Sequence, residues 1–298
     1  MSGGSAVSPS PGVPAPAAPW QEVSARLLRN APLPGKRHHY AVAEVPAELP
    51  TPRAGQFVMV APAPCPPGLL LRRPMSVARA WREGGRQYLG FLYTVVGTGT
   101  RELARAAEAW SLLGPMGRPY PDAAGPRVLV GGGRGVAPLV LLAEECAARG
   151  EPVLFLNGAR NVAELVAPRE LDAPPLAAGS IELEATEDGS RGRAGKVLEL
   201  LAAPLVRSAL ERPGAAFYSC GPHGLLAAVG VAARAVGAPA WVALEAHMAC
   251  GTGICRSCVV PRAPGAAAPP GASNAEYVLA CLDGPVVEAA GVDWERAL

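Results

Sequence analysis

The stretch A-C-G-T-G-I-C-R-S-C-V-V, residues 249–260, sets three cysteines at C-x4-C-x2-C spacing. A fourth cysteine follows the third after an interval of 22 residues. Four thiolates are the ligand set of a [2Fe–2S] cluster, and this spacing is one of the established patterns for such a cluster. The sequence therefore predicts an iron–sulfur site whose ligands are Cys250, Cys255, Cys258 and Cys281.

The residues between these cysteines suit a loop that curls around a small inorganic core. Gly251 and Gly253 have no Cβ, so the backbone can turn sharply there. Small neighbours such as Thr252 and Ser257 leave backbone N–H groups free to point at the sulfurs. Zinc remains a rival, although zinc sites usually show two close cysteine pairs. A disulfide framework is not expected in a chain of this length without a signal peptide.

The composition favours a globular protein with more than one domain. The chain has 298 residues, 50% of them hydrophobic, which is ample for two domains and a small third unit. A net charge of +2 gives no reason to expect nucleic acid as a partner. There is no run of about 18 apolar residues to span a membrane, and the N-terminus lacks the layout of a signal peptide. The cysteines suit a reducing compartment, so we expect a cytoplasmic protein.

The first part of the chain predicts a disordered tail and then a small β-barrel. Residues 1–19 are rich in Pro, Ala, Ser and Gly, and such a composition does not repay the entropy of ordering. Within residues 20–125, short strand signals recur between prolines and glycines, as in an antiparallel barrel. The prolines of Ala61–Gly68 predict a loop, and a helix is expected near Arg101–Ala109. The expected strands include Tyr40–Val45, Gln56–Val60, Met75–Ala80, Tyr88–Val96 and the turn-rich Gly114–Tyr120.

Residues 126–248 alternate strand and helix signals, which predicts a Rossmann-like α/β domain with helices on both faces of a parallel sheet. The expected strands are Arg127–Val130, Val153–Asn157, Ile181–Ala185, Ala216–Cys220 and Trp241–Glu245. The expected helices are Val136–Arg149, Ala163–Leu171, Lys196–Leu210 and Leu225–Val236. Residues 249–298 then form a small cluster-binding segment. The predicted fold class is an α+β multidomain protein.

Two motifs in the barrel part can bind a flavin. The run Arg73-Pro74-Met75-Ser76 heads a predicted strand, and a guanidinium beside a hydroxyl can hold a diphosphate. Alone, this run also fits a solvated arginine and a strand serine. In the second motif, Leu92–Thr100, a strand ends in glycines and Thr100 can cap a following helix whose N–H groups attract an anion. An ordinary capped helix after a turn would have the same sequence.

Two further motifs follow strands of the α/β part. Gly131, Gly133 and Gly135 permit a tight turn and a close approach of a pyrophosphate to a helix N-terminus. Their spacing is not the G-x-G-x-x-G fingerprint, because no third glycine follows at the required position. The pair Cys220-Gly221 lies where it can line a nicotinamide site, although a free cysteine more often fills the core.

Taken in order, the motifs R-P-M-S, Y-T-V-V-G-T-G-T, G-G-G-x-G-x-x-P and C-G-P resemble the ferredoxin–NADP reductase superfamily. In that superfamily an N-terminal barrel binds the flavin and an α/β domain binds the nicotinamide. The run from Leu244 to Cys258, L-E-A-H-M-A-C-G-T-G-I-C-R-S-C, is very similar to the electron-transfer subunits of type B dihydroorotate dehydrogenase. The ending Tyr277–Val287, Y-V-L-A-C-L-D-G-P-V-V, is similar to the closing segment of those subunits.

The resemblance implies a role for each motif. It implies NAD at the loop of Gly131, Gly133 and Gly135 and at the Cys220-Gly221 pair, and a [2Fe–2S] cluster on the four cysteines. The choice between NAD and NADP stays open, because Arg160 could meet a 2′-phosphate. The residues that the resemblance assigns to FAD are Arg73, Pro74, Met75, Ser76, Leu92, Tyr93, Thr94, Gly99 and Thr100.

The resemblance also implies an oxidoreductase function in pyrimidine biosynthesis. Dihydroorotate would be oxidised on an FMN-containing catalytic partner, and electrons would cross through the cluster and FAD to NAD⁺. Two copies of each subunit would form a heterotetramer. The same motifs allow a related flavin and iron–sulfur subunit of a hydrogenase, sulfite reductase or transhydrogenase complex. A non-enzymatic module whose cysteines hold zinc is the other alternative.

Overall fold

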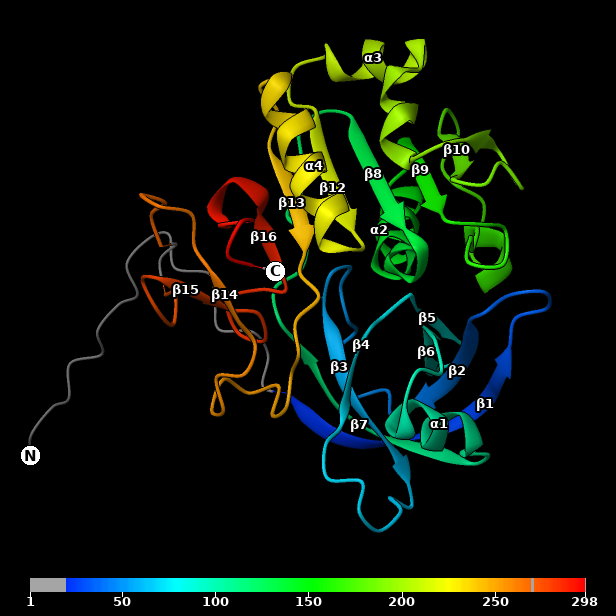
Figure 1. Ribbon diagram of the computed structural model, residues 1–298. Coiled ribbons are helices and arrows are strands. Elements are labelled where there is room, and N and C mark those ends of the chain that lie inside the picture. The colour runs from blue at the N-terminus through cyan, green and yellow to red at the C-terminus, as the bar shows by residue number, and fades with distance from the viewer. Residues whose placement is uncertain (1–19, 269–270, 298) are drawn as a thin grey trace, which may run out of the picture.

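The computed structural model describes residues 20–268 and 271–297, so the predicted disordered tail lies outside the described residues. The described chain forms a β-barrel, an α/β unit and a C-terminal segment that lies beside both (Figure 1). No helix within the described ranges is long and apolar enough to cross a membrane.

The N-terminal part is a seven-stranded antiparallel sheet in the order β4-β3-β7-β1-β2-β6-β5. Its strands are β1 (Gln21–Pro32), β2 (His39–Val45), β3 (Phe57–Ala63), β4 (Arg73–Ser76), β5 (Arg79–Glu83), β6 (Arg86–Tyr93) and β7 (Ala109–Met116). The link between β4 and β5 curls the sheet into a barrel. Its Val77 N–H donates to the carbonyl of Gln56 (3.4 Å), and its Ala78 N–H donates to the carbonyl of Gly90 (2.9 Å). The predicted antiparallel barrel is confirmed.

Strand β1 was not expected from the sequence, and β7 begins before the turn-rich strand expected over Gly114–Tyr120. The register of β1 shifts between Leu27 and Arg29, which breaks the alternation of polar and apolar residues. The loop predicted over Ala61–Gly68 is wrong in its first part, since β3 continues to Ala63. Beyond Val60, β3 pairs with β7 alone, so the proline there faces a free edge that needs no backbone donor.

Two other barrel predictions need correction. The predicted strand Met75–Ala80 is interrupted by the closing link between β4 and β5. The helix predicted over Arg101–Ala109 begins and ends earlier, as α1 (Thr98–Arg105), because Ala106 has an extended backbone with φ −63° and ψ 122°.

The second part is a seven-stranded sheet in the order β11-β10-β9-β8-β12-β13-β16, and all its pairings are parallel except that of β13 with β16. Its strands are β8 (Arg127–Gly132), β9 (Val153–Ala159), β10 (Ile181–Thr186), β11 (Arg193–Ala194), β12 (Ala216–Cys220), β13 (Ala240–Ala243) and β16 (Val286–Glu288). The helices are α2 (Ala137–Ala148), α3 (Pro204–Leu210) and α4 (His223–Ala235), with 3₁₀ helices η1 (Gly133–Val136), η2 (Pro168–Leu171), η3 (Val197–Ala202) and η4 (Ala289–Gly291).

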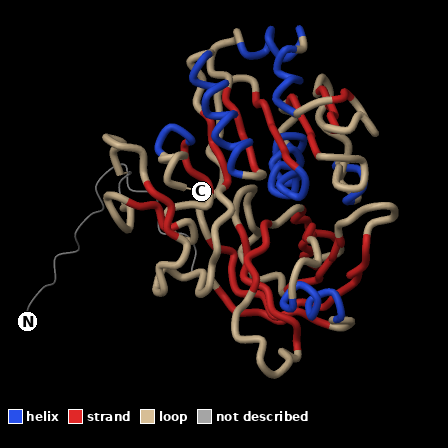
Figure 2. Tube along the Cα trace, viewed as in Figure 1, coloured by secondary structure: helices blue, strands red, loops and turns tan. Residues whose placement is uncertain are grey.

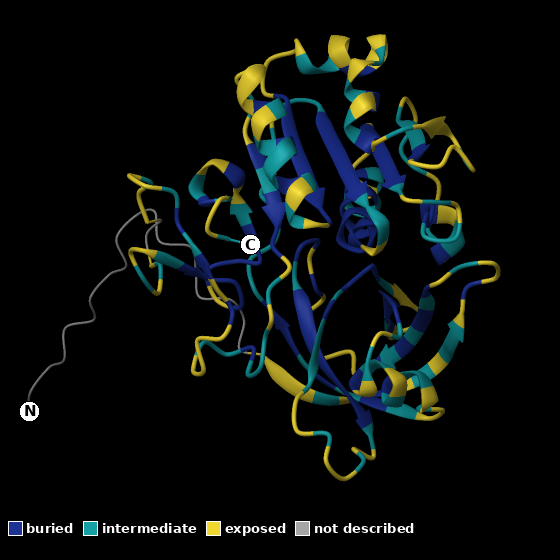
Figure 3. Ribbon diagram, viewed as in Figure 1, coloured by how far each residue is buried: buried dark blue, intermediate teal, exposed yellow. Residues whose placement is uncertain are grey.

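The helices bury both faces of this sheet, as predicted. The α2 face shares one core with the barrel, and the face under η3 and α4 forms a second core. The central strands between them are almost fully buried (Figure 3). A T-shaped contact between Tyr120 and Tyr218 and a 2.9 Å hydrogen bond from the Tyr120 hydroxyl to the Ser219 carbonyl fasten the chain after β7 to β12.

Two predicted helices of the α/β part are wrong. Over Ala163–Leu171 only the single turn η2 is helical, because the residue before Pro168 is held in an extended conformation. The predicted helix Lys196–Leu210 divides into η3 and α3 for the same reason. Ala203, which precedes Pro204, has ψ 134° and therefore cannot continue a helix.

The C-terminal segment is mostly loop (Figure 2) and contains the hairpin of β14 (Val259–Pro261) and β15 (Tyr277–Leu279). It packs against the barrel through Phe57, Met59 and Met116, which share a small core with Cys258 and Cys281. The chain then returns to the α/β unit, where β16 adds the edge strand beside β13. The segment is therefore fastened to both other parts.

Candidate functional site

A cavity of about 500 Å³ lies where the barrel meets the carboxyl ends of β12 and β13; we call it the junction cavity. Its barrel wall carries both predicted flavin motifs, and its other wall includes Gly135 and Cys220. The structure thus brings together the predicted site residues Arg73, Pro74, Met75, Ser76, Leu92, Tyr93, Thr94, Thr100, Gly135 and Cys220. Burial raises the pKa of the Cys220 thiol, so it is a neutral apolar wall group and not a nucleophile.

The first turn of α1 lies beside the Arg73 side chain. A Cβ on Gly99 would lie 2.0 Å from Nε of Arg73, so the glycine lets this guanidinium lie directly against the helix backbone. Thr100 is not the helix cap that the sequence predicted, because Gly97 occupies that position. Its hydroxyl instead accepts the N–H groups of Val96 (3.0 Å) and Gly97 (3.2 Å), which orders the turn from inside the helix.

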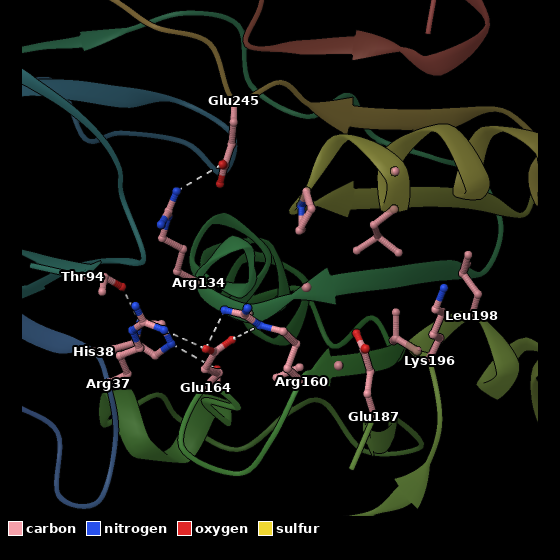
Figure 4. A pocket seen from close by; sticks show the side chains of 18 of the residues that line it. Arg37, His38, Thr94, Arg134, Arg160, Glu164, Glu187, Lys196, Leu198 and Glu245 are labelled. Carbon is pink, nitrogen blue, oxygen red and sulfur yellow. Dashed lines mark hydrogen bonds and ion pairs between the residues drawn. The ribbon is translucent and has the colours of Figure 1, made fainter. Parts of the chain in front are cut away.

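A second cavity of about 740 Å³ lies over the carboxyl ends of β8 and β9; we call it the sheet cavity. Gly133 lines it with φ +55°, a conformation that favours glycine. Gly131 and Gly221 line neither of the two cavities. The cavity wall is strongly charged (Figure 4), with the side chains of Arg37, Arg134, Arg160, Lys196, Glu164, Glu187 and Glu245.

The two cavities adjoin. Thr94, Val96, Arg134 and Glu245 line both of them. Arg134, from the glycine-rich turn, pairs with Glu245 after β13 at 3.3 Å, and this pair stands between the two spaces. A ligand in one cavity can therefore touch a ligand in the other. Sequence analysis did not single out Arg134 or Glu245, although both lie inside motifs that it quoted.

The four predicted cluster ligands lie together on the C-terminal segment. The Sγ atoms of Cys258 and Cys281 are 3.4 Å apart, and Cys250 Sγ accepts the N–H groups of Thr252 (3.3 Å) and Cys255 (3.5 Å). Burial acts to raise the pKa of Cys250, but these N–H donors outweigh it and lower the pKa to about 6. The contact with Cys281 lowers the pKa of Cys258 to about 6 as well.

This donor set fits a [2Fe–2S] cluster better than a single zinc ion. The thiols fall into two groups: buried Cys258 and Cys281 lie 3.4 Å apart at their Sγ atoms, and exposed Cys255 reaches Cys250 through its N–H, which donates to Cys250 Sγ at 3.5 Å. Zinc requires four ligands around one ion, whereas two irons can each take two thiolates. N–H donors aimed at a sulfur are the outer contacts that such clusters use.

Two glycines and one aspartate shape the cysteine loop. Gly251 has φ +74°, and a Cβ there would lie 2.7 Å from Cγ of Met59, so the loop can press directly on the barrel. A Cβ on Gly253 would lie 2.2 Å from Leu282. The buried carboxylate of Asp283 accepts three hydrogen bonds, from the Leu279 N–H (2.9 Å) and from the N–H and hydroxyl of Ser273 (2.9 and 2.6 Å). Sequence analysis assigned no role to Asp283.

Comparisons with known proteins agree with this architecture. The family described as "Oxidoreductase NAD-binding domain" matches residues 129–230. The family described as "Iron-sulfur cluster binding domain of dihydroorotate dehydrogenase B" matches residues 245–293. A solved NADH-dependent reduced ferredoxin–NADP oxidoreductase is similar over 96% of this chain and 92% of its own, at 26% identity and a TM-score of 0.73. A cytochrome P450 reductase from Amycolatopsis shares the fold, with 22% identity, a TM-score of 0.61 and coverage of 76% of this chain and 69% of its own.

The fold and the two matched domains define an oxidoreductase subunit of the ferredoxin–NADP reductase superfamily, with an added iron–sulfur segment. The electron transfer subunit of dihydroorotate dehydrogenase B (NAD(+)) from Geobacillus thermodenitrificans is 36% identical over 249 residues, which cover 80% of this chain and 86% of that protein. Its counterpart from Listeria monocytogenes serotype 4a is 34% identical over 244 residues, covering 79% and 85%. The chain belongs to the family of these electron transfer subunits.

Proposed function

We propose that this chain carries electrons between an FMN-containing partner that oxidises dihydroorotate and NAD⁺. In this proposal the junction cavity holds FAD, the sheet cavity admits the dinucleotide, and the four cysteines hold the [2Fe–2S] cluster. Two copies of each subunit would assemble. When bound, FAD would exchange two electrons with nicotinamide and single electrons with a cluster. Neither nicotinamide nor the cluster can make both kinds of exchange.

The observation that carries the proposal is the continuity of the three sites. Phe57 lines the junction cavity and also packs in the core that contains Cys258 and Cys281. Met248 does the same from the segment that leads into the cysteine loop. On the opposite side, the Arg134–Glu245 pair belongs to both cavities. Neighbouring sites therefore share wall residues.

The residues of the junction cavity suit a flavin with a diphosphate. The Arg73 guanidinium lies over the first turn of α1, where free N–H groups add to its positive charge. Met75, Leu92 and Tyr93 are largely buried strand residues that offer an apolar wall for a ring. The protein's contribution is to place and orient the groups.

An alternative partner would leave these sites unchanged. The similarity to the NADH-dependent reduced ferredoxin–NADP oxidoreductase, with a TM-score of 0.73 over 96% of the chain, favours a transhydrogenase-type complex as the second candidate. Purification of the complex from its native host separates the two candidates. A partner that reduces NAD⁺ with dihydroorotate supports the first, and a partner that exchanges electrons between two dinucleotides supports the second.

The proposal is tested first by an anaerobic visible spectrum of the purified chain, with iron and flavin quantified. We expect flavin bands and a broad iron–sulfur shoulder, at about two irons and one FAD per chain. NADH should bleach both features. Stoichiometric zinc with a featureless spectrum would overturn the proposal.

A further inference from the structure

Glu164 stands at the edge of the sheet cavity where the α/β unit meets the barrel (Figure 4). Its carboxylate accepts two hydrogen bonds from the Arg160 guanidinium, 2.9 Å from Nε and 2.7 Å from Nη2. Arg37, from the β1–β2 hairpin, donates to the same carboxylate at 3.2 Å. The backbone carbonyl of Glu164 also lies 3.1 Å from Nε2 of His38. One carboxylate therefore engages two guanidinium groups of the cavity wall.

Arg160 lies where the ribose of a dinucleotide binds in such sheets. It follows directly after β9, at the carboxyl end of the parallel sheet, which is the edge where such sheets bind dinucleotides. An arginine near this edge is the group that accommodates the 2′-phosphate of NADP. The side chain of Arg160 is 68% exposed and so within reach of a ligand, whereas that of Glu164 is only 15% exposed.

We infer that Glu164 makes this chain prefer NAD over NADP, because its carboxylate already occupies the guanidinium groups of Arg160 and Arg37. This inference rests on the proposed function, since it concerns the dinucleotide of the sheet cavity. A 2′-phosphate could take the two-point Nε–Nη2 edge of Arg160 only by displacing Glu164, which would leave a largely buried carboxylate with fewer partners. The 2′-hydroxyl of NAD makes no such demand, so the ion pair can stay closed.

The substitution Glu164→Gln tests the inference. It keeps the size of the side chain and removes the charge that competes with a phosphate. We expect the affinity for NADP⁺ to rise about tenfold in calorimetric titration of the purified chain, a change of about 1.4 kcal/mol. The affinity for NAD⁺ should change by less than about threefold. Adding Arg160→Ala to Glu164→Gln should remove the gain.

Glu187→Gln is the matched control, because Glu187 lines the same cavity with the same charge and acts on Arg160 through its charge alone, whereas Glu164 accepts two hydrogen bonds from Arg160. An equal gain in NADP⁺ affinity from both single variants, or a gain from Glu187→Gln alone, would overturn the inference. If Glu164→Gln loosens the fold, Glu164→Asp gives the second test. It keeps the charge, breaks the two-point contact with Arg160 and should give an intermediate gain. A wild-type chain that binds neither dinucleotide would refute the proposed function itself.

Discussion

The cluster segment and the sheet cavity are built in opposite ways. The thiols of the cluster segment come from one short loop and one nearby turn, and local N–H groups and Asp283 hold them in place. The sheet cavity collects its wall from the β1–β2 hairpin, the ends of β6, β8, β9 and β10, and from η3 and α4. A substitution in the cluster segment should therefore abolish binding of the iron–sulfur cluster. A substitution at the sheet cavity should change the affinity for the dinucleotide, or the stability of the fold, only in part.

The largest expected effect is on the cluster side. Cys258→Ser should remove the [2Fe–2S] cluster, because a buried hydroxyl cannot replace a thiolate that sits 3.4 Å from Cys281. Iron per chain should fall from about two to near zero in anaerobic preparations. Cys65→Ser is the control, since Cys65 is exposed on the link between β3 and β4. Full iron content in Cys258→Ser would mean that another residue is the ligand.

Removal of the Asp283 carboxylate should come next. Asp283→Ala leaves three donors without their acceptor in a buried turn, which should cost about 3 kcal/mol of the free energy of unfolding. Urea titration with tyrosine and tryptophan fluorescence measures this cost. Asp188→Ala, in an exposed turn that bonds Ser190, should cost less than about 0.5 kcal/mol. Equal costs for the two variants would show that Asp283 does not organise the cysteine loop.

On the cavity side, the strongest support is the buried side chain of Lys36. Its ammonium donates to the carbonyls of Val162 (2.9 Å) and Leu165 (2.6 Å) and pairs with Glu170 at 3.1 Å. Lys36→Met should destabilise the chain by about 2 kcal/mol, because two carbonyls and a carboxylate lose their cation.

Arg26→Met is the control for Lys36→Met, since Arg26 pairs with Glu44 on an exposed face of the barrel. It should change the free energy of unfolding by less than about 0.5 kcal/mol in the same urea titration. A cost for Lys36→Met as small as this would show that Lys36 does not stabilise the wall of the sheet cavity.

The smallest expected effect is a pH dependence that His38 contributes. Burial lowers the pKa of His38 below its ordinary value of 6.5. As the pH falls, the unfolded chain therefore takes up the proton before the folded chain does. The contribution of neutral His38 to the free energy of unfolding is fully present above pH 6.5 and is lost as the pH falls toward the folded-state pKa. The urea midpoint should drop less between pH 7 and about 5.5 in His38→Gln than in the wild type. An equal drop of the urea midpoint in His38→Gln and in the wild type would contradict this role of His38.

The same contrast explains how much could be predicted from the sequence. The antiparallel barrel, the alternation of strands and helices and the cysteine-bearing C-terminal segment were predictable, because spacing and periodicity are local signals. The failure over Ala163–Leu171 has a local cause, the extended residue before Pro168, and a distant one that the sequence does not show. Carbonyls that would close a helix are taken by Lys36, which lies 126 residues before Val162 and 129 before Leu165. No local pattern carries that information.

The division of the glycine-rich turn between two cavities was also beyond the sequence. Gly133 faces the sheet cavity, Gly135 faces the junction cavity and Gly131 faces neither. A Cβ on Gly135 would lie 2.4 Å from the carbonyl of Cys220, so this glycine is needed for contact between two turns. That requirement depends on the end of β12, far along the chain. Sequence analysis gave all three glycines a single role.

The last strand of the described chain, β16, also protects an edge of the second sheet. β16 covers the free backbone groups of β13, whose other side is already paired with β12. A chain cut before Val286 would expose these groups as an open sheet edge, which is a template for pairing with another chain. Such a shortened protein would be expected to self-associate. Light scattering would detect this self-association.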